Sequence, residues 1–145
     1  MTIRRAINID ANQIFGIETQ CFSVPWTLNS IKADLKNPIA YYWVAVIDTK
    51  IVGYIGLWNV VGEGQITNVA VSPTARGQGV AQALINHMIQ FACEKEMTEI
   101  MLEVRASNHV ARYIYEKLGF KQLSVRKNYY TNPREDAINM KLIPN

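Results

Sequence analysis

The sequence predicts a mixed α/β domain, and three observations lead to this prediction. Short apolar runs rich in β-branched and aromatic residues alternate with stretches that have the 3.6-residue period of amphipathic helices. Some apolar runs are separated by hairpin-length turns and others by a helix, so both antiparallel and crossover connections are expected. The length of 145 residues, with 49% hydrophobic and 19% charged, is typical of one globular domain spanning 1–145. We therefore expect a single domain built on a mixed sheet.

The N-terminal part is predicted to form an edge strand and two helices. Residues 2–9 alternate loosely between apolar and polar side chains, as in a strand. Asp10 is a candidate N-cap, and Gln13 three positions later would complete a capping box. This helix should end near Pro25, because the residue before a proline avoids the helical conformation. Thr27 is the expected cap of a second, short helix.

Strands and helices alternate along the rest of the chain. The predicted strands are residues 41–47, 51–58, 66–71, 99–104, 120–125 and 137–142. One helix is expected from Val80, and another should be capped by Ser107 or Asn108 and stop at Gly119. Residues 128–135 (N-Y-Y-T-N-P-R-E) are predicted to form a polar, aromatic loop.

Two glycine patterns indicate places where the backbone is approached closely. Gly53 and Gly56 lie inside a predicted strand, which indicates either bulges or close contact with a backbone or ligand. Further on, residues 76–79 (R-G-Q-G) separate the strand at 66–71 from the helix at Val80. That order brings free N–H groups and the positive end of a helix dipole to one point, which favours phosphate. The pattern is neither a dinucleotide fingerprint nor a P-loop, so a plain strand-to-helix turn is the alternative.

Glu103 and Tyr115 are the residues best suited to acid–base chemistry. Leu102 and Val104 share one face of a predicted strand, and Glu103 lies on the other. A carboxylate in such a strand is costly unless it is paired or functional, and desolvation would make it a stronger base. Pairing with Arg105 or exposure to water is the alternative. Tyr115 lies on the inner side of its helix, where a packing role is the alternative.

Charge and cysteine content exclude several classes of protein. The net charge of +3 suits anionic small ligands but is far from a dense basic patch, so no direct nucleic-acid contact is expected. No run of 18 apolar residues or secretory h-region is present, so we expect no membrane association and a cytoplasmic location. Cys21 and Cys93 lie outside any C-x-x-C or histidine cluster, which is typical of a reducing compartment and predicts no metal site.

Several motifs resemble those of one enzyme family. Residues 76–81 (R-G-Q-G-V-A) resemble the R/Q-x-x-G-x-G/A acyl-CoA pyrophosphate loop of the GNAT-type N-acetyltransferases. Residues 102–108 (L-E-V-R-A-S-N) and 115–120 (Y-E-K-L-G-F) are similar to the N-terminal-amine acetyltransferases of that family. Further matches resemble the bacterial RimI subgroup, which acetylates the N-terminal alanine of ribosomal protein S18: residues 25–26 (P-W), 128–130 (N-Y-Y) and 135–137 (E-D-A).

The resemblance implies a fold, a co-substrate and roles for residues. The fold would be the GNAT fold, a mostly antiparallel central sheet flanked by helices and splayed between the strands at 66–71 and 99–104. Acetyl-CoA would be the co-substrate, without a metal, and the amine would attack directly in a ternary complex. Glu103 would be the base and Tyr115 the acid. The residues implied to bind the cofactor are Val69, Ala70, Val71, Arg76, Gly77, Gln78, Gly79, Val80, Ala81, Asn108 and Tyr115.

The amine side is less closely specified by the sequence. The implied partner is the N-terminus of ribosomal protein S18, with the chain a monomer or weak oligomer. Trp26, Tyr129 and Tyr130 are candidates to line a peptide cleft, and Glu63 is a candidate to face the amine. Ordinary packing, or solvent exposure for Glu63, is the alternative. Two other functions stay open: an acetyltransferase for a polyamine, aminoglycoside or amino acid, and a non-catalytic module that senses acyl-CoA.

Overall fold

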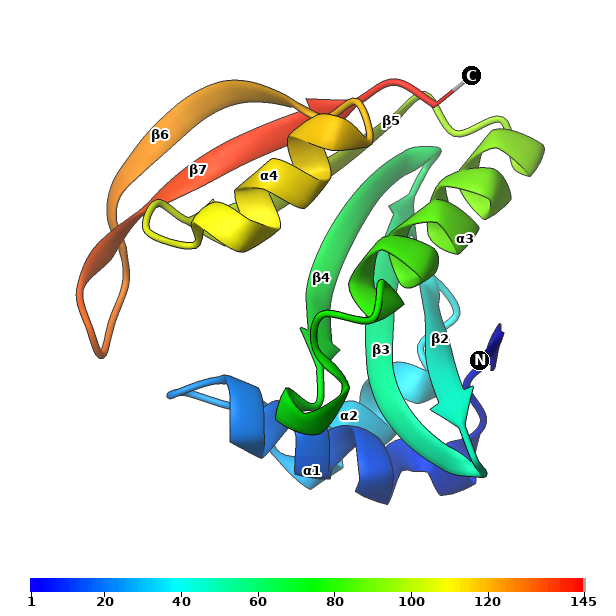
Figure 1. Ribbon diagram of the computed structural model, residues 1–145. Helices are drawn as coiled ribbons and strands as arrows, with labels where there is room; N and C mark the ends of the chain where they lie inside the picture. Colours follow the sequence, from blue (N-terminus) through cyan, green and yellow to red (C-terminus); the bar gives the residue numbers. More distant parts are fainter. Residues whose placement is uncertain (145) are drawn as a thin grey trace.

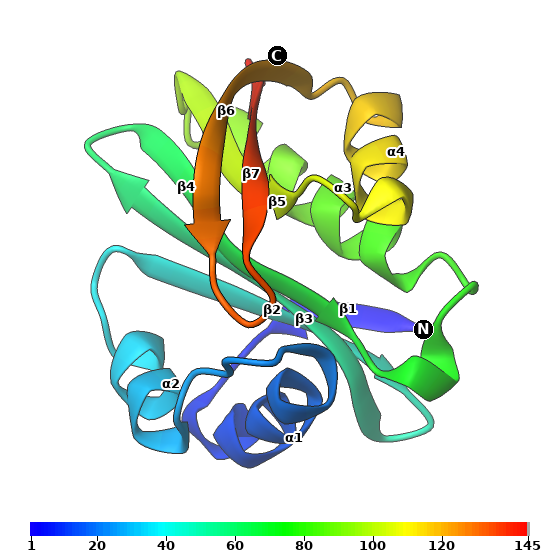
Figure 2. The ribbon, with the colours of Figure 1, turned by 90° about the vertical axis from the view of Figure 1, so that its left-hand side faces the viewer.

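The computed structural model describes residues 1–144 and has a seven-stranded sheet with helices on both faces (Figures 1 and 2). The predicted domain boundary at Asn145 lies outside the described residues. In chain order the elements are β1 (Thr2–Arg5), η1 (Asn8–Asp10), α1 (Ala11–Cys21), α2 (Leu28–Leu35), β2 (Ala40–Ile47), β3 (Lys50–Val60), β4 (Glu63–Val71), η2 (Pro73–Ala75), α3 (Val80–Glu94), β5 (Glu99–Arg105), α4 (His109–Lys117), β6 (Lys121–Tyr130) and β7 (Glu135–Leu142).

The sheet has the order β1-β2-β3-β4-β5-β7-β6. Within residues 1–144, β4 and β5 pair in parallel and every other neighbouring pair is antiparallel. This confirms the mixed, mostly antiparallel sheet. Among the described helices, none combines the length and apolarity that a membrane-spanning segment needs.

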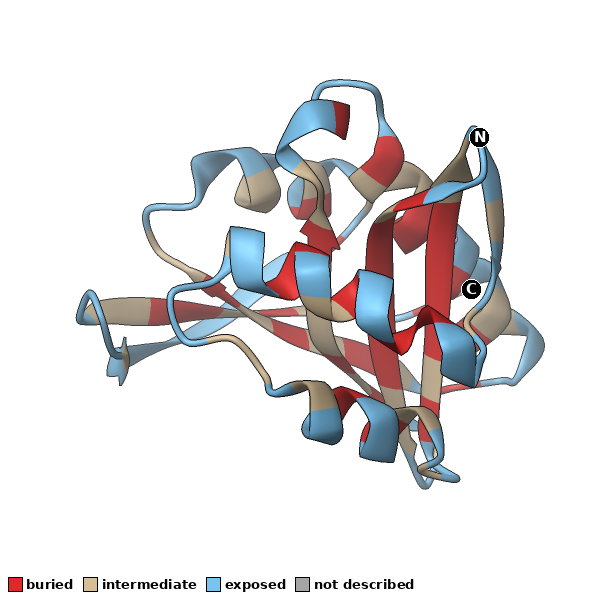
Figure 3. Ribbon diagram, turned by 90° about the horizontal axis from the view of Figure 1, so that it is seen from below, coloured by how far each residue is buried: buried red, intermediate tan, exposed pale blue. Residues whose placement is uncertain are grey.

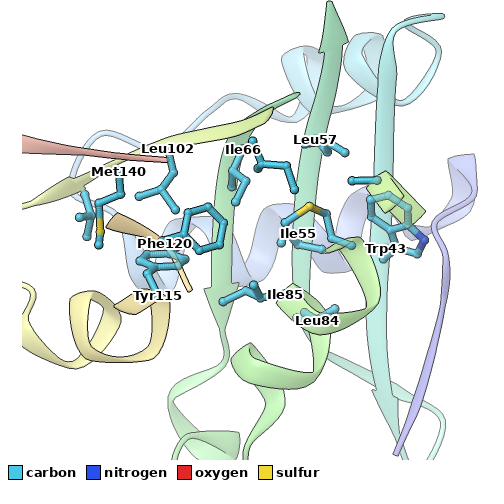
Figure 4. Close-up of a cluster of buried hydrophobic side chains, with 14 of the residues drawn as sticks. Trp43, Ile55, Leu57, Ile66, Leu84, Ile85, Leu102, Tyr115, Phe120 and Met140 are labelled. Atoms are coloured by element: carbon cyan, nitrogen blue, oxygen red, sulfur yellow. The ribbon is translucent and has the colours of Figure 1, made fainter. Parts of the chain in front are cut away.

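Each face of the sheet has its own core. On one face, α3 and α4 cover the larger cluster, whose side chains include Trp43, Leu57, Leu84, Leu102 and Phe120 (Figure 4). On the other face, α1 and α2 pack against β2, β3 and β4. The central strands are mostly buried, whereas the outward sides of the helices are exposed (Figure 3). The 3.6-residue period of the helices accounts for this division.

Local capping chemistry sets several element boundaries as expected. Thr27 Oγ1 accepts a hydrogen bond from Ser30 N at 3.1 Å and begins α2. Asn108 Oδ1 accepts one from Ala111 N at 3.2 Å and begins α4. Gly119 follows α4 with φ of +103°, the left-handed conformation that glycine adopts without strain.

Asp10 occupies the N-cap position of α1 as predicted, but the capping box expected with Gln13 is wrong. Asp10 precedes α1, but its side chain caps nothing there and instead accepts hydrogen bonds from Arg4 at 2.8 and 3.0 Å and from Ile7 N at 2.8 Å. Gln13 Oε1 accepts from Ile51 N of β3 rather than turning back to the helix start. The charged Arg4 offers Asp10 stronger hydrogen bonds than backbone amides of the helix do.

Several predicted boundaries also differ from the structure, among them the start of β4, which lies at Glu63 instead of residue 66. Strand β1 ends at Arg5 instead of residue 9, and α1 ends at Cys21, four residues before Pro25. The loop predicted at 128–135 is largely a hairpin, because β6 runs to Tyr130 and β7 begins at Glu135. Only residues 131–134, which we call the β6–β7 turn, lie between the two strands.

Gly56 lies beside a bulge, one of the two alternatives expected for a strand glycine. It pairs with Asn68, whereas Leu57 pairs with Ile66, so Thr67 forms a bulge in β4. A Cβ on Gly56 would lie 2.4 Å from Thr67 Oγ1. The missing side chain of Gly56 therefore leaves room for Thr67 at the bulge.

The pairing of β4 with β5 is short. It includes only the pairs Glu63–Glu99, Gly64–Ile100 and Gln65–Met101. Beyond these pairs the two strands diverge, as Figure 1 shows. We call this region the splay, and it lies where the sequence resemblance implied it.

Candidate active site

The splay leaves one edge of β4 without a neighbouring strand. Beyond Gln65, β4 pairs with β3 alone. Ser72 N donates to Val52 O of β3 at 2.7 Å. Because backbone groups alternate in direction along a strand, the peptide groups of Val69 and Val71 face the splay. An extended ligand could therefore pair with β4 there as an added strand would.

The two glycines of the turn after β4 adopt a conformation that disfavours other residues. Gly77 and Gly79 both have φ of +78°, and a Cβ on either would have no atom within 4 Å. Backbone conformation, and not lack of space, therefore calls for glycine. The first helical bond of α3 runs from Ala83 N to Gly79 O. The N–H groups of Val80 and Ala81 therefore have no acceptor within the helix and lie at its positive end.

Arg76 lies between the end of β4 and this turn. Its Nε donates to Val71 O at 3.2 Å, and its Nη2 approaches Cys21 Sγ at 3.3 Å. The side chain is nevertheless exposed, as is Gln78. A guanidinium beside free helix N–H groups gives this corner a concentrated positive charge suited to phosphate oxygens.

Glu103 projects from β5 on the face opposite Leu102 and Val104, as the alternation predicted. Its Oε1 accepts a hydrogen bond from Arg126 Nη1 at 3.3 Å, so its ionic partner is Arg126 and not Arg105. Its Oε2 is buried and has no hydrogen-bond partner among the described residues. A buried acceptor without a donor is costly, which makes this oxygen a natural position for an incoming N–H group.

Two tyrosines at the end of β6 lie beside Glu103. Tyr129 and Tyr130 pack edge to face with ring centroids 5.1 Å apart. Burial, and then the negative charge of Glu103, raises the pKa of Tyr129 and raises that of Tyr130 to about 12. Arg126 lies 4.6 Å from the Tyr129 ring centre, and Arg105 lies 4.4 Å from that of Tyr130. The two cations help to hold these rings in place.

Tyr115 reaches this region from the other face of the sheet. It belongs to α4, is 7% exposed and packs edge to face on Phe120 at 5.6 Å (Figure 4). Burial, and then the nearby Tyr130, raises the pKa of Tyr115, so its hydroxyl is protonated at neutral pH. Within residues 1–144 that hydroxyl makes no hydrogen bond. Tyr115 thus offers an unused proton donor on one face, and Glu103 offers an unused acceptor on the other.

Arg105, two residues after Glu103 on β5, holds the β6–β7 turn in place. Its guanidinium donates to Pro133 O at 2.9 Å and to Thr131 O at 3.1 Å, and it pairs with Glu135 at 3.3 Å. Glu135 in turn accepts from Ser107 N at 2.6 Å, and these donors lower the pKa of Glu135. The turn that follows the two tyrosines is therefore anchored to the end of β5.

The remaining predicted residues are spread more widely. Trp26 is half-buried in the loop between α1 and α2, and its backbone N donates to Glu18 at 2.9 Å. Asn108 is occupied as the α4 cap by Ala111. Glu63 is exposed at the end of β4 where the two strands still pair, so the structure does not bring it together with the residues at the splay.

Two side chains near the site, Arg126 and Glu18, were not predicted from the sequence. Arg126 pairs with Glu103 only because of the β6–β7 register, which contains an irregularity that no local motif reveals. Glu18 is a buried carboxylate, and a signal for it was present. It lies four residues after Ile14 and three before Cys21, on the apolar stripe of α1. Within the described part of the chain, no three His, Cys, Asp or Glu side chains converge as metal ligands would.

Comparison with known proteins identifies the family. Residues 11–120 match the acetyltransferase (GNAT) family. The chain belongs to this family. GNAT acetyltransferases use acetyl-CoA, which agrees with the co-substrate expected from residues 76–81.

Relatives cover nearly the whole chain. This GNAT acetyltransferase is 40% identical over 132 residues to a Bacillus subtilis protein, covering 90% of this chain and 87% of that one. It is 35% identical over 135 residues to the ribosomal protein bS18-alanine N-acetyltransferase of Haemophilus influenzae, covering 90% of both. The crystal structure of the ribosomal-protein-S18-alanine N-acetyltransferase from Escherichia coli superposes with a TM-score of 0.93 at 31% identity, covering 99% of this chain and 93% of that one. These similarities confirm the fold and the resemblance expected from the sequence.

Proposed function

We propose that this acetyltransferase transfers the acetyl group of acetyl-CoA to the N-terminal α-amino group of a protein, the alanine of ribosomal protein S18. The names of the Haemophilus influenzae relative at 35% identity and of the Escherichia coli structure at 31% identity support the substrate. The observation that carries the proposal is the buried, unpartnered Oε2 of Glu103 beside Tyr129 and Tyr130. It offers an acceptor for an amine next to aromatic side chains that suit a peptide.

The residues around the splay fit acetyl-CoA, which supplies the acetyl group as a thioester. The pantetheine arm carries amides that can pair with the free edge of β4 at Val69 and Val71, on either side of Ala70. The pyrophosphate suits the turn from Arg76 through Gly77, Gln78 and Gly79 to the first amides of α3. Asn108 could contact the arm through its amide nitrogen, because its Oδ1 is used by the cap.

Glu103 is suited to act as the general base. An α-amino group has a pKa near ~7.7–8.0, so a large fraction is protonated at neutral pH and must lose a proton before attack. The free Oε2 of Glu103 can take that proton, directly or through a water, while Arg126 holds Oε1. The neutral amine nitrogen then bonds to the acetyl carbon.

Tyr115 is suited to act as the general acid. As the bond from the acetyl carbon to sulfur breaks, the sulfur takes the hydroxyl proton of Tyr115, which is present at neutral pH because a tyrosine is protonated well below its ordinary pKa near ~10. A backbone N–H of Val69 or Val71 can stabilise negative charge on the acetyl oxygen, as in an oxyanion hole. Trp26, Tyr129 and Tyr130 would line the approach of the peptide, and no residue of the chain is acylated.

A direct assay tests the substrate. The purified enzyme is mixed with acetyl-CoA and either a peptide with the S18 N-terminal sequence, spermine or an aminoglycoside, and the product is identified by mass spectrometry. We expect acetylation of the peptide α-amine with the highest kcat/KM. Preference for spermine or the aminoglycoside would overturn the protein substrate and favour a small-amine enzyme.

A matched pair of variants tests the base. Glu103→Gln should lower kcat at neutral pH by roughly 10²–10⁴-fold, the usual cost of losing a general base. Glu99→Gln is the control, since Glu99 is on the same strand and face but pairs with Lys141 at 3.5 Å. It should keep kcat near that of the wild type. A pH–rate profile of Glu103→Gln unchanged from the wild type would show that Glu103 is not the base.

A further inference from the structure

Glu18 is a buried carboxylate that the proposed reaction does not use. It lies on α1 and is 2% exposed. Its Oε1 accepts hydrogen bonds from the Tyr54 hydroxyl and from Asn68 Nδ2, the latter at 3.1 Å. Its Oε2 accepts one from Trp26 N at 2.9 Å. Burying a carboxylate is costly unless donors satisfy both oxygens, and here they do.

The two oxygens of Glu18 hold two different parts of the site. Asn68 immediately precedes Val69, where the backbone of β4 faces the splay. Trp26 belongs to residues 22–27, which connect α1 to α2 and which we call the amine-side loop. This loop has a second anchor, because Ser23 Oγ donates to Asn132 O of the β6–β7 turn at 2.5 Å. Glu18 thus connects the strand that faces the cofactor to the loop that faces the peptide.

All three partners of Glu18 act as donors, so the position needs an acceptor at both ends. Burial and the charge of Glu18 raise the pKa of Tyr54, which keeps its hydroxyl protonated. The Trp26 donor is a backbone N–H and cannot reverse its role. A glutamine at position 18 has one acceptor oxygen and one NH2 group. Its oxygen would face the strand end, where it accepts from two donors, Tyr54 and Asn68. Its NH2 group would then face Trp26 N, and the loop contact would be lost.

We propose that Glu18 is a positioning residue that fixes the amine-side loop and thereby sets the affinity for the peptide substrate. It acts through Trp26 and does not touch the reacting atoms. The inference rests on the proposed function for the identity of the peptide, whereas the anchoring of the loop is independent of it. Its effect should therefore appear in the KM for the peptide and not in the chemical step.

The kinetic test compares two conservative variants. For Glu18→Gln, we expect the KM for an S18 N-terminal peptide to rise about tenfold, the order expected for one lost charged hydrogen bond. The kcat and the KM for acetyl-CoA should stay within about twofold. Tyr54→Phe is the control, because it removes a donor from the strand end of Glu18 and leaves the Trp26 contact intact. An equal rise in peptide KM for Tyr54→Phe, or a fall in kcat alone for Glu18→Gln, would overturn the inference.

A second readout does not depend on activity. Amide hydrogen exchange of Trp26, measured by NMR, should accelerate about tenfold or more in Glu18→Gln, because Glu18 is the acceptor that protects it. Glu18→Asp is the fallback if Glu18→Gln does not fold, since it keeps the charge and shortens the reach by one methylene. Unchanged exchange in both variants would refute the anchor. Accelerated exchange in an enzyme that ignores the S18 peptide would support the anchor and refute the proposed substrate.

Discussion

Gly56→Ala is expected to destabilise the protein by an amount that the structure defines. The added Cβ would lie 2.4 Å from Thr67 Oγ1 and 2.7 and 2.8 Å from two ring atoms of Tyr42. Thr67 would have to retreat by about 0.6 Å to reach 3.0 Å, and Tyr42 cannot move freely because its hydroxyl is bound to Asp34 at 2.5 Å. Overpacking of this kind costs about 1–3 kcal/mol, and the restrained Tyr42 ring places it near the upper end. A loss of about 3 kcal/mol lowers Tm by roughly 10 °C.

Urea and thermal unfolding measure this cost against two other glycines. Gly53→Ala in the same strand brings its Cβ only to 3.0 Å from Val80, so the loss should be about 1 kcal/mol. Gly16 is an exposed position of α1, and a Cβ there would have no atom within 4 Å. Gly16→Ala should therefore stabilise the protein by about 0.5–1 kcal/mol. A free energy of unfolding for Gly56→Ala within about 0.5 kcal/mol of the wild type would refute the steric reasoning.

Three further variants probe the site and the fold. Tyr115→Phe should lower kcat by about 10²-fold or more, while calorimetry should show that acetyl-CoA still binds. Loss of acetyl-CoA binding would instead assign Tyr115 to the cofactor pocket or to packing. Arg105→Lys should raise the peptide KM by about fivefold, because one ammonium cannot bind two carbonyls of the β6–β7 turn and also stack on Tyr130. An unchanged KM would show that the turn does not depend on this contact. Asp10→Asn should cost about 1–3 kcal/mol at pH 7 by urea unfolding. Hydrogen bonds from Arg4 lower the pKa of Asp10, so its contribution to stability is present above the ordinary aspartate pKa near ~3.9 and is lost as pH falls through the lowered value. An Asp10→Asn cost that does not shrink as the pH is lowered below ~3.9 would contradict this.

Features determined by a few neighbouring residues were predictable from the sequence. The caps at Thr27 and Asn108 and the stop at Gly119 depend on side chains within one turn of the helix end. The capping box expected at Asp10 did not form, because the Asp10 side chain binds the charged Arg4 of β1, which lies outside the helix. The loop predicted at 128–135 failed because polar, aromatic composition cannot distinguish a loop from an exposed hairpin, and β6 is exposed over almost its whole length.

The site divides in the same way. Alternation along a strand was enough to place Glu103 on the face away from the core, and the glycine pattern was enough to locate the turn before α3. The partner of Glu103 was not predictable, because the choice of Arg126 over Arg105 depends on an irregular β6–β7 register. Glu18 was visible as a carboxylate on an apolar stripe, but its donors come from distant strands.

Because β4 and β5 pair over so short a length, a bound ligand can add to the free energy of unfolding of this enzyme. Backbone pairing joins the half-sheet of β1 to β4 to that of β5, β7 and β6 through three residue pairs only, and the rest of the contact is side-chain packing in the larger cluster. A ligand lying along the open edge of β4 would supply the missing strand and bind the folded state alone. At a hundredfold excess over its Kd, such a ligand adds about 2.7 kcal/mol to the free energy of unfolding. The melting temperature of this chain should therefore follow the concentration of acyl-CoA around it.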